Sequence, residues 1–446
     1  MKKALAFPML AIALFVYADD GQTSVGSRMF LAEHWVTSWA ASAQGPFPSG
    51  FTVMQPSFSH VFPQPKTGAV NQSFRMIVRP DVWGAATRIQ LSNAYGTKPV
   101  TFDDVFVGLQ AESSEVMANT NTHVTFGGLN SVTVQPGSSA WSDAVPIMFA
   151  GPRPDLLQGR KLAISFHVPG PSGPITWHAK ALTTSYMTAP GSGSKSAEEE
   201  EAAFPFSVTS WFFVDAVDMM MPRDTNAIVT FGDSITDGEG ATLNSPDRWP
   251  DILSRRLHRR FGDRVSVVNA AITGNQVAGP VFYSAENPSP GGPAAVDRLE
   301  RDVLGLSGVS TVIWFEGTND ISENGFSTLD MVKEKLREGV QRIRTRLPKA
   351  KIIGATLTSA RGDYDPAYGS AEHEQRREAL NSYVRTSGLF DYVIDFDAAT
   401  TDPASGELRP ELAFSTSTDG AGDKLHPNRL GYLAMGAAAD VVAIRP

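Results

Sequence analysis

Short apolar runs with the character of β-strands occupy the first half of the chain. From about Trp35 to Val217, segments rich in β-branched and aromatic residues are interrupted by Gly, Pro, Asn or Ser at roughly ten-residue intervals. This pattern is typical of an all-β domain, because such side chains pack well on a pleated surface. A sandwich-like fold is favoured over a barrel. The candidate strands are residues 73–78, 87–91, 100–107, 123–126, 131–134, 161–168 and 176–178.

The pattern changes near Asn226, where continuous apolar runs begin to alternate with segments of helical period. Strands buried on both faces read as continuous apolar runs, so this alternation predicts βαβ units and a parallel sheet. The expected strands are 227–231, 265–269, 310–316, 352–357 and 392–396, and the expected helices are 250–261, 295–304, 329–347 and 372–387, with an alanine-rich helix within 427–443. We therefore expect a three-layer α/β domain with a doubly wound, flavodoxin-like sheet. Such sheets hold their chemistry at the carboxyl ends of the strands.

The amino-terminal end reads as an export signal. Lys2 and Lys3 precede an apolar run at 4–16, and Val16, Tyr17 and Ala18 end in a small residue suited to cleavage. The mature protein would then begin near Asp19 and be secreted or periplasmic. An uncleaved membrane anchor is the alternative. The run is short for a bilayer and no later stretch is long enough to span one, so no stable membrane insertion is expected.

These patterns divide the chain into three parts: a signal peptide at 1–18, a β-rich domain at 19–218 and an α/β domain at 226–446. Inside the β-rich part, residues 190–203 combine Gly-Ser pairs with consecutive glutamates at 198–201. That composition cannot bury apolar surface and predicts a mobile acidic loop. A solvated surface loop is favoured over a partner-binding tail.

Composition narrows the classes of function. With 446 residues and 42% hydrophobic residues, the chain exceeds one usual hydrophobic core and can fill two. Its net charge of -9 and the lack of a basic cluster argue against a nucleic-acid partner. The chain has no cysteine, which excludes thiol nucleophiles, zinc-thiolate sites and disulfides.

A candidate nucleophile follows the first predicted parallel strand. The sequence Phe-Gly-Asp-Ser-Ile-Thr-Asp-Gly at 231–238 places Ser234 on the turn that leaves the strand. A helix amino terminus at this turn would offer backbone N–H groups to a developing negative charge. A serine hydroxyl alone is a weak nucleophile, so it needs a base whose orientation a third group fixes.

The end of the chain supplies that base and its partner. Asp423 stands three residues before His426, so within one tight turn the carboxylate can hold one ring nitrogen while the other faces Ser234. Pro427 suits the first position of a following helix and would fix the loop. We expect Ser234 as nucleophile, His426 as general base and Asp423 as the group that orients the imidazole.

Four blocks together resemble the GDSL or SGNH hydrolase family. Gly-Asp-Ser-Ile-Thr at 232–236 is similar to the first block, with Ile235 where the family usually has leucine. Residues 269–275 (Asn-Ala-Ala-Ile-Thr-Gly-Asn) resemble the glycine block, 317–320 (Gly-Thr-Asn-Asp) the asparagine block, and 423–426 the last block. Each block alone is a weak signal. All of them in family order, at predicted strand ends or before the last helix, are hard to attribute to chance.

The resemblance implies an oxyanion hole. Its donors would be the backbone N–H groups of Ser234 and Gly274 and the side-chain amide of Asn319. A tetrahedral oxyanion needs preorganised donors, and glycine lets the backbone approach closely. The resemblance covers the chain from Asn226 to its end.

The first half carries a weaker likeness. Residues 35–39 (Trp-Val-Thr-Ser-Trp) and 88–99 resemble the amino-terminal β domain that precedes the hydrolase domain in some secreted bacterial members. This likeness implies that the two halves work as one enzyme. What the first half binds stays open.

For several other residues, a structural role is favoured over a functional one. His167 and His178 lie in predicted strands, where packing is favoured over a metal-binding role. Asp395 and Asp397 alternate at the end of the fifth strand, but a structural role is favoured over paired catalytic carboxylates. No metal and no cofactor is expected.

The tryptophans of the β-rich part are a further case. They could form a sugar-binding platform, although core packing is favoured because aromatic residues dominate such cores; they are Trp35, Trp39, Trp177 and Trp211. No Gly-x-Ser-x-Gly elbow surrounds Ser234, so a lipase of the α/β-hydrolase fold is not supported.

The leading hypothesis is a secreted serine ester hydrolase (an esterase or lipase, that is, an acylhydrolase) that works through an acyl-Ser234 intermediate. The loop at 275–292 follows the glycine block and should border the substrate pocket, and its apolar members Val277, Val281, Phe282 and Tyr283 favour an uncharged group. The partner is then a small-molecule or polysaccharide ester. A carbohydrate acetyl esterase and a catalytically silent carbohydrate-binding protein are the alternatives. The oligomeric state stays open.

Overall fold

Antiparallel strands build the β-rich region (residues 33–222), as the sequence predicts. The computed structural model describes residues 33–150, 153–325, 327–413 and 423–445. One sheet has the order β1 (Glu33–Ala40), β15 (Val214–Pro222), β4 (Ala86–Ser92) and β8 (Ser139–Trp141), and β9 (Val145–Pro146) also pairs with β4. A second has the order β13 (Phe206–Val208), β12 (Ser185–Met187), β3 (Gln72–Val78), β10 (Leu162–Val168), β5 (Val100–Leu109) and β6 (Thr122–His123), and β7 (Ser131–Val134) pairs with β5. A small sheet joins β14 (Trp211–Phe212), β11 (Thr176–His178) and β2 (Gly45–Pro46).

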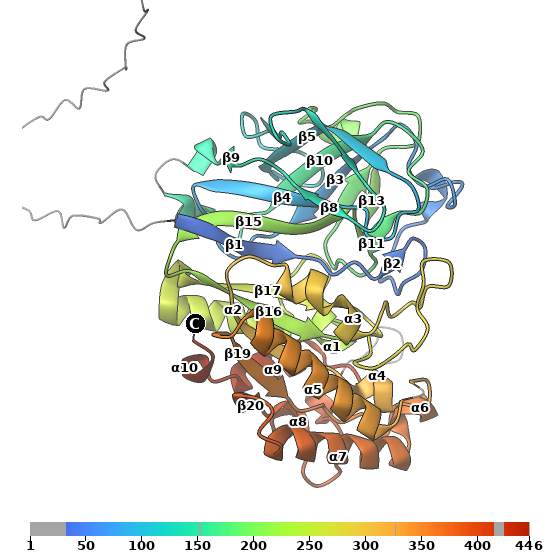
Figure 1. Ribbon diagram of the computed structural model, residues 1–446, viewed down its shortest axis with the longest axis vertical. Helices are drawn as coiled ribbons and strands as arrows, with labels where there is room; N and C mark the ends of the chain where they lie inside the picture. The colour runs from blue at the N-terminus through green and yellow to red at the C-terminus, as the bar shows by residue number, and fades with distance from the viewer. Residues whose placement is uncertain (1–32, 151–152, 326, 414–422, 446) are drawn as a thin grey trace, which may run out of the picture. The chain divides into compact units, whose positions relative to one another are not determined.

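Aromatic side chains fill the core of this region. Phe74 on β3 stacks on Phe166 of β10 with ring centroids 5.1 Å apart, and Phe213 meets both rings edge-on. Leu91 on β4 and Val217 on β15 are fully buried in the same cluster. Because the cluster draws on both larger sheets, their shared burial stabilises the stack of strands seen in the upper part of Figure 1.

A parallel sheet forms the centre of the α/β region (residues 226–445), which confirms the predicted parallel arrangement. Its strand order is β17 (Val265–Ala271), β16 (Asn226–Gly232), β18 (Val309–Phe315), β19 (Lys351–Ala355) and β20 (Tyr392–Ile394). The central strands are buried on both faces, which explains why they read as continuous apolar runs. The order reverses between β16 and β18, so loops leaving these two strands and β17 border one crevice.

Helices cover both faces of the parallel sheet (Figure 1). The helices after the second, third and fourth strands pack on one face, and the first and last long helices pack together on the other. The first group is α3 (Ala295–Leu299) with its π-helical continuation η6 (Glu300–Leu304), α5 (Leu329–Arg346) and α7 (Ala371–Thr386). The second group is α2 (Trp249–Phe261) and α9 (Arg429–Ala438).

Short helices mark the loops. In the β-rich region they are η1 (Phe58–His60), η2 (Met148–Ala150), η3 (Pro154–Leu157) and η4 (Glu201–Ala203). In the α/β region they are α1 (Ser234–Asp237), η5 (Gly262–Arg264), α4 (Thr318–Ile321), α6 (Pro366–Gly369), α8 (Phe396–Thr400), η7 (Pro410–Leu412) and α10 (Val441–Ile444). Three of them, α1, α4 and α8, begin within three residues of the end of a parallel strand.

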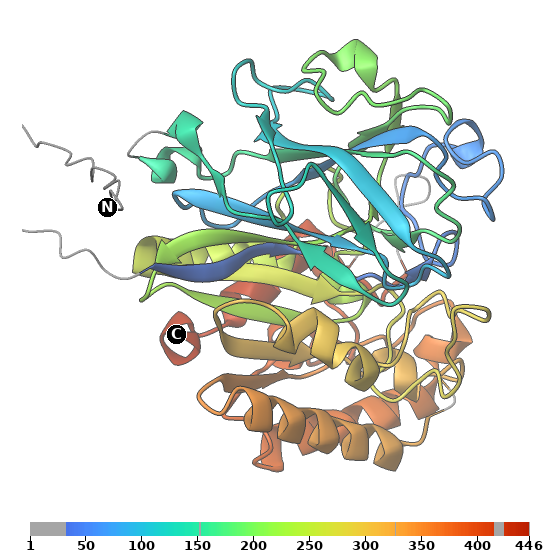
Figure 2. The ribbon, with the colours of Figure 1, turned by 45° about the horizontal axis from the view of Figure 1, so that its top comes forward.

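The two regions meet along edge strands. In both views β1 runs beside β17, the edge strand of the parallel sheet (Figures 1 and 2). The Ser266 hydroxyl on β17 donates to the Thr37 carbonyl on β1 at 2.8 Å, and the Thr37 N–H donates to Ser307 O at 3.0 Å. An uncovered edge strand is prone to pair with other chains, so β1 protects β17 as well as joining the two regions.

The structure also corrects the ends of some predicted strands and helices. The predicted strand 123–126 ends at His123 in β6, and the predicted strand 392–396 ends at Ile394 because Asp395 caps α8 through the Ala398 N–H. The expected carboxy-terminal helix is split, since α9 ends at Ala438 and Asp440 caps a separate α10. At both places an aspartate caps a new helix, so the preceding strand or helix ends before it.

The structure leaves some of the predictions untested. The signal peptide at 1–18 lies outside the described residues, and the domain boundaries stay predictions. The acidic segment packs on the β-rich region, since the Arg75 guanidinium contacts the carbonyl of Glu198 and the Val116 N–H donates to Glu199 O, while its mobility stays a prediction. Within the described ranges, no helix is both long and apolar enough to cross a bilayer.

Candidate active site

Ser234 lies at the carboxyl end of β16, at the first position of α1. Asp233 is the N-cap of this helix, and its Oδ1 accepts the Ile235 N–H at 3.1 Å. A Cβ on Gly232 would lie 2.4 Å from the Phe315 carbonyl oxygen, so only glycine fits where the chain leaves the sheet. The turn therefore fixes the serine above the strand end, with 5% of its surface exposed.

Three of the predicted residues form one hydrogen-bonded chain. Ser234 Oγ lies 2.9 Å from His426 Nε2, and His426 Nδ1 lies 2.5 Å from Asp423 Oδ2. The serine and the histidine are 192 positions apart in the chain, so the fold rather than local sequence brings them together. This is the arrangement in which an imidazole can accept a proton from a serine hydroxyl.

A tight turn holds the carboxylate and the imidazole. Asp423 Oδ1 accepts the backbone N–H groups of Leu425 at 3.0 Å and of His426 at 2.8 Å. Lys424, which directly follows Asp423, has a left-handed φ of +56°. Burial alone would raise the pKa of Asp423, but the hydrogen bonds and charge of His426 lower it. Asp423 is therefore a carboxylate that can stabilise a positive imidazolium.

The three predicted oxyanion donors come from the ends of β16, β17 and β18. Gly274 follows β17 in a turn closed by the Asn275 N–H bond to Ile272 O at 3.0 Å, and its φ of +78° is the left-handed value that favours glycine. Asn319 lies in α4, and its Nδ2 donates to the Asn275 carbonyl at 2.8 Å. The amide of Asn319 is thus anchored one residue from Gly274 and keeps a second N–H for another acceptor.

Two residues that contact Asn319 or the glycine-block loop were not predicted to have a functional role. The Tyr368 hydroxyl, from α6, donates to Asn319 Oδ1 at 2.9 Å. Asp320, which belongs to the asparagine block, accepts the N–H groups of Val277 and Ala278, both at 2.7 Å. Tyr368 fixes which way the amide points, and Asp320 holds the start of the loop after the glycine block. Only the position of Asp320 within its block could have drawn attention to it.

A buried arginine braces the strand ends beneath the serine. Arg298 in α3 donates to Gly232 O at 3.0 Å, Ala270 O at 2.7 Å and Asn275 Oδ1 at 2.6 Å. These groups lie at the carboxyl ends of β16 and β17 and in the glycine-block turn. One guanidinium therefore links the two segments that carry Ser234 and Gly274.

Three buried acids with raised pKa values follow the ends of β16 and β18. Burial, together with the charge of Glu316, raises the pKa of Asp233 well above its usual value. Burial raises the pKa of Glu316 to about 7 and that of Asp320 to about 7 as well. With raised pKa values, these three acids carry less negative charge at neutral pH than exposed carboxyl groups would.

The β-rich region reaches this site. The Phe51 ring packs against Gly274, since a Cβ on that glycine would lie 2.7 Å from Phe51 Cε2, and the ring is about half exposed. The Tyr283 hydroxyl donates to the Gln44 carbonyl at 3.1 Å. The loop at 275–292, which is predicted to border the pocket, therefore contacts the β-rich region. Its apolar members differ, because Val277 is fully buried in the core while Phe282 is exposed.

Most of the histidines and tryptophans singled out in the sequence are buried in the β-rich region. His167 Nδ1 lies 2.7 Å from Asp103, and its Nε2 lies 2.9 Å from Asn71. Among the tryptophans, the structure buries Trp39, Trp177 and Trp211, while Trp35 is covered on one side by the Arg88 guanidinium. Among the described residues, no cluster of His, Asp and Glu side chains is arranged to hold a metal ion.

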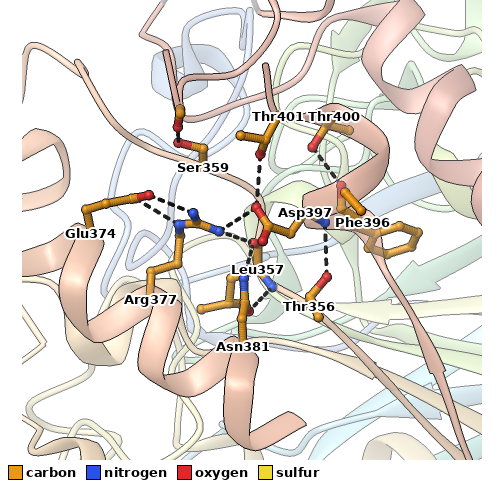
Figure 3. Close-up of polar contacts among 12 residues, drawn as sticks. Thr356, Leu357, Ser359, Glu374, Arg377, Asn381, Phe396, Asp397, Thr400 and Thr401 are labelled. Carbon is orange, nitrogen blue, oxygen red and sulfur yellow. Dashed lines mark hydrogen bonds and ion pairs between the residues drawn. The ribbon is translucent and has the colours of Figure 1, made fainter. Parts of the chain in front are cut away.

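Asp395 and Asp397 lie away from the serine, at the start of α8. Arg377 forks between Glu374 and Asp397, with contacts of 2.7 Å to each carboxylate (Figure 3). Arg385 pairs with both Asp395 and Asp397 at 2.8 and 2.9 Å. These contacts give the two aspartates a structural role in fastening α7 to α8.

Comparison with known proteins finds similar solved structures and one family model. Solved structures similar to this chain include a lipase/acylhydrolase from Enterococcus faecalis, with 24% identity, 48% of this chain and 93% of that chain covered, and a TM-score of 0.36. A carbohydrate acetylesterase from Sinorhizobium meliloti has 17% identity, covers 49% and 97%, and has a TM-score of 0.36. A family two carbohydrate esterase from Clostridium thermocellum, in complex with cellohexaose, has 14% identity, covers 82% and 89%, and has a TM-score of 0.32.

The comparison with curated proteins finds no match. The model of the GDSL-like lipase/acylhydrolase family matches residues 230–434. This range includes all four blocks, from the nucleophile turn to the aspartate–histidine pair, and confirms the resemblance noted in the sequence. The chain therefore carries, at residues 230–434, a domain of the GDSL-like lipase/acylhydrolase family.

Proposed function

We propose that this protein hydrolyses carboxylic esters through an acyl intermediate on Ser234. One observation carries the proposal: Ser234 Oγ lies 2.9 Å from His426 Nε2, while Asp423 holds the opposite ring nitrogen at 2.5 Å. A serine with such a base and such an orienting carboxylate is equipped for nucleophilic attack.

In the acylation half of the reaction, His426 Nε2 accepts the Ser234 proton as Oγ attacks the ester carbonyl carbon. Asp423 stabilises the imidazolium that results. The oxyanion is expected to accept hydrogen bonds from the N–H groups of Ser234 and Gly274 and from the Asn319 amide. His426 then gives its proton to the departing alcohol, which leaves an acyl ester on Ser234.

In the deacylation half, His426 accepts a proton from water as the water oxygen attacks the acyl carbon. The tetrahedral intermediate collapses, the Ser234 oxygen leaves and recovers its proton from His426, and the carboxylic acid is released. Each cycle consumes one ester and one water and yields one alcohol and one acid, without a cofactor.

The wall formed by Phe51 favours a small acyl group and supports a second, narrower candidate, a carbohydrate acetyl esterase. The ring lies against Gly274, next to where the ester carbonyl would sit, and limits the space there. A half-exposed aromatic side chain at a pocket edge is also suited to contact a sugar face. We expect acetyl esters to be preferred over long-chain ones.

A substrate panel separates these candidates. We expect kcat/KM to fall from acetyl through butyryl to octanoyl p-nitrophenyl esters, because the longer chains would meet Phe51. Acetate release from acetylated xylan or pectin would establish the carbohydrate esterase. A preference for octanoyl esters over acetyl esters would overturn the assignment of a small acyl pocket.

The Ser234→Ala variant tests the nucleophile directly. We expect it to lower kcat on p-nitrophenyl acetate by roughly 10⁴-fold or more, because no other group forms the acyl intermediate. Circular dichroism should match that of the wild type, since within the described residues the removed hydroxyl contacts only His426. Retained activity would remove Ser234 from this role, and an inactive wild type would favour a silent binding protein.

We further propose that residues 1–18 direct export and are removed. The charged start, the apolar run and the small-residue site in the sequence support this. Amino-terminal sequencing of the exported protein should begin near Asp19, and an intact Met1 on a membrane-bound form would favour an anchor instead.

A further inference from the structure

A histidine from the β-rich region lies buried beneath the nucleophile turn. His178 ends β11, and 4% of its surface is exposed. Its ring lies 5.5 Å from the Trp211 ring, tilted by 34°. Packing alone does not account for it, because both ring nitrogens have polar partners.

Every partner of the His178 ring is an acceptor. Nδ1 lies 2.8 Å from the Ser42 carbonyl oxygen. Nε2 lies 3.0 Å from the Lys180 carbonyl oxygen and 3.2 Å from Asp237 Oδ1. A neutral imidazole has one nitrogen that carries a lone pair, and here that lone pair would face a carbonyl oxygen at hydrogen-bond distance. Only the imidazolium, with an N–H on each nitrogen, satisfies all of these contacts.

Asp237 connects this histidine to the glycine block. It is the last residue of α1, three positions after Ser234, and its Oδ2 accepts both the Thr273 N–H at 2.9 Å and the Thr273 hydroxyl at 2.7 Å. Thr273 directly precedes Gly274. One carboxylate thus ties the segment that carries the nucleophile to the segment that carries a proposed oxyanion donor.

The charges around the ring are compatible with an imidazolium. Asp237 faces it from α1 and Asp215 from β15, while the Lys180 ammonium is nearby and pairs with Glu239. Burial alone would lower the pKa of His178, but Asp237 and the carbonyl acceptors raise it. Burial likewise would raise the pKa of Asp237, and His178 and Thr273 lower it instead. Because Glu239 pairs with Lys180 and Arg301 offsets Asp215, Asp237 is the charge that acts on the ring most strongly.

We propose that His178 is a positioning residue of the ester hydrolase, a buried imidazolium that holds the Asp237 carboxylate and through it the Thr273–Gly274 turn in register with Ser234. This inference rests on the proposed function and gives the β-rich region a role in positioning the catalytic residues. That region supplies His178 to the Asp237 carboxylate, while Arg248 of the α/β region donates to the Asp237 backbone carbonyl at 3.4 Å. The two regions would then form one catalytic unit.

The protonation state can be measured without any substrate. In the full-length protein labelled with ¹⁵N-histidine, ring ¹⁵N shifts at pH 8 should show both His178 nitrogens protonated, with the resonances assigned by their loss in His178→Asn. A neutral tautomer at pH 8 would overturn the proposal. Because the resting protein is observed, this result is independent of whether any ester is hydrolysed.

Two variants test the positioning role. Thr273→Val keeps the backbone bond to Asp237 and removes only the hydroxyl bond, and His178→Asn removes the cation. We expect kcat on p-nitrophenyl acetate, and the rate of labelling by a fluorophosphonate, to fall roughly 10- to 100-fold in His178→Asn and less in Thr273→Val, with little change in KM. His167→Asn, which removes another buried histidine of the same region, is the matched control and should leave both rates unchanged.

The outcomes distinguish the two proposals. Unchanged rates in both His178→Asn and Thr273→Val would overturn the positioning role while leaving the ester hydrolase intact. If His178→Asn fails to fold, the His178 resonances are assigned by exclusion, from the signals lost in variants of the other histidines, and the ¹⁵N shifts and Thr273→Val still decide. Failure of the proposed function would instead appear as a wild type that neither turns over esters nor reacts with the fluorophosphonate.

Discussion

Asn319 owes its orientation to two neighbours from different parts of the chain. Its Nδ2 donates to the Asn275 carbonyl at 2.8 Å, and its Oδ1 accepts the Tyr368 hydroxyl at 2.9 Å. A side-chain amide can rotate and exchange its two ends, so these contacts decide that an N–H, not the oxygen, is available to an oxyanion. The proposed oxyanion donor is therefore the Asn319 amide as it is held by its two hydrogen-bond partners.

Two substitutions separate the donor from the group that orients it. Asn319→Ala should lower kcat by about 10²- to 10³-fold, as expected for one lost oxyanion donor. Tyr368→Phe should lower kcat less, because the amide stays and loses only its orientation. KM for p-nitrophenyl acetate should change little in both. A Tyr368→Phe effect as large as that of Asn319→Ala would mean that the hydroxyl itself touches the substrate.

At this scale the sequence predicts residues within motifs and misses residues outside them. The predicted residues stand in short blocks of recognisable spacing; they are Ser234, Gly274, Asn319, Asp423 and His426. The structure places the first three after neighbouring strand ends and the aspartate–histidine pair in the turn before α9, where His426 reaches Ser234. Tyr368 and His178 act through contacts between distant segments. Neither the turn residues nor the motif spacing in the sequence predicts such a contact.

The junction of α7 and α8 shows how a polar cluster fastens elements. Asp395 caps α8, and the Arg377 guanidinium reaches Glu374 on its own helix, Asp397 on α8 and the Leu357 carbonyl after β19 (Figure 3). Burial alone would raise the pKa of Asp397, but Arg377 lowers it. The junction is therefore built from ionised groups that satisfy one another away from water.

Removing the buried arginine should be costly. Arg377→Met preserves much of the side-chain volume but leaves Glu374 and Asp397 without their cation, so we expect a loss of about 3 to 5 kcal/mol in the free energy of unfolding. Arg385→Met is the matched control at the exposed rim of the same cluster and should cost at most about 1 kcal/mol. Urea unfolding measures both. Equal losses would show that burial is not the deciding factor.

Elements with a clear period were predicted well, and those whose burial depends on partners were not. The helices α5 and α7 and the strands β3 and β16 match their expected ranges to within one or two residues. The pattern did not single out β15, which contains a run of methionines and two aspartates. One of these, Asp218, is fully buried, where Arg88 and Thr37 satisfy it. A sequence pattern cannot show that a distant arginine makes a buried acid tolerable.

The whole molecule depends on polar contacts across the seam between the two regions. Asp81 of the β-rich region accepts the Ser254 hydroxyl at 2.5 Å and His258 Nε2 at 3.0 Å on α2, and the Val267 N–H at 2.7 Å on β17. Burial alone would lower the pKa of His258, but the carboxylates of Asp263 and Asp81 raise it to about 10. One carboxylate therefore clamps the first helix and the edge strand of the α/β region.

Asp81→Ala should loosen this seam. Because the buried Val267 N–H and His258 lose their acceptor, we expect the free energy of unfolding to fall by about 2 to 4 kcal/mol at pH 7. His258 has a raised pKa, so its contribution is fully present below about pH 6.5 and is lost as the pH rises through about 10. The loss should accordingly shrink at pH 10.5. A loss that does not depend on pH would contradict this account of the His258 pair.

The central claim is that Ser234 is an activated nucleophile, and its covalent labelling is the most direct test. The full-length protein should react with a fluorophosphonate, and peptide mass spectrometry should place the adduct on Ser234. Ser234→Ala should not be labelled, and His426→Ala should be labelled far more slowly because the base is lost. An adduct on another serine, or unchanged labelling in His426→Ala, would contradict the account.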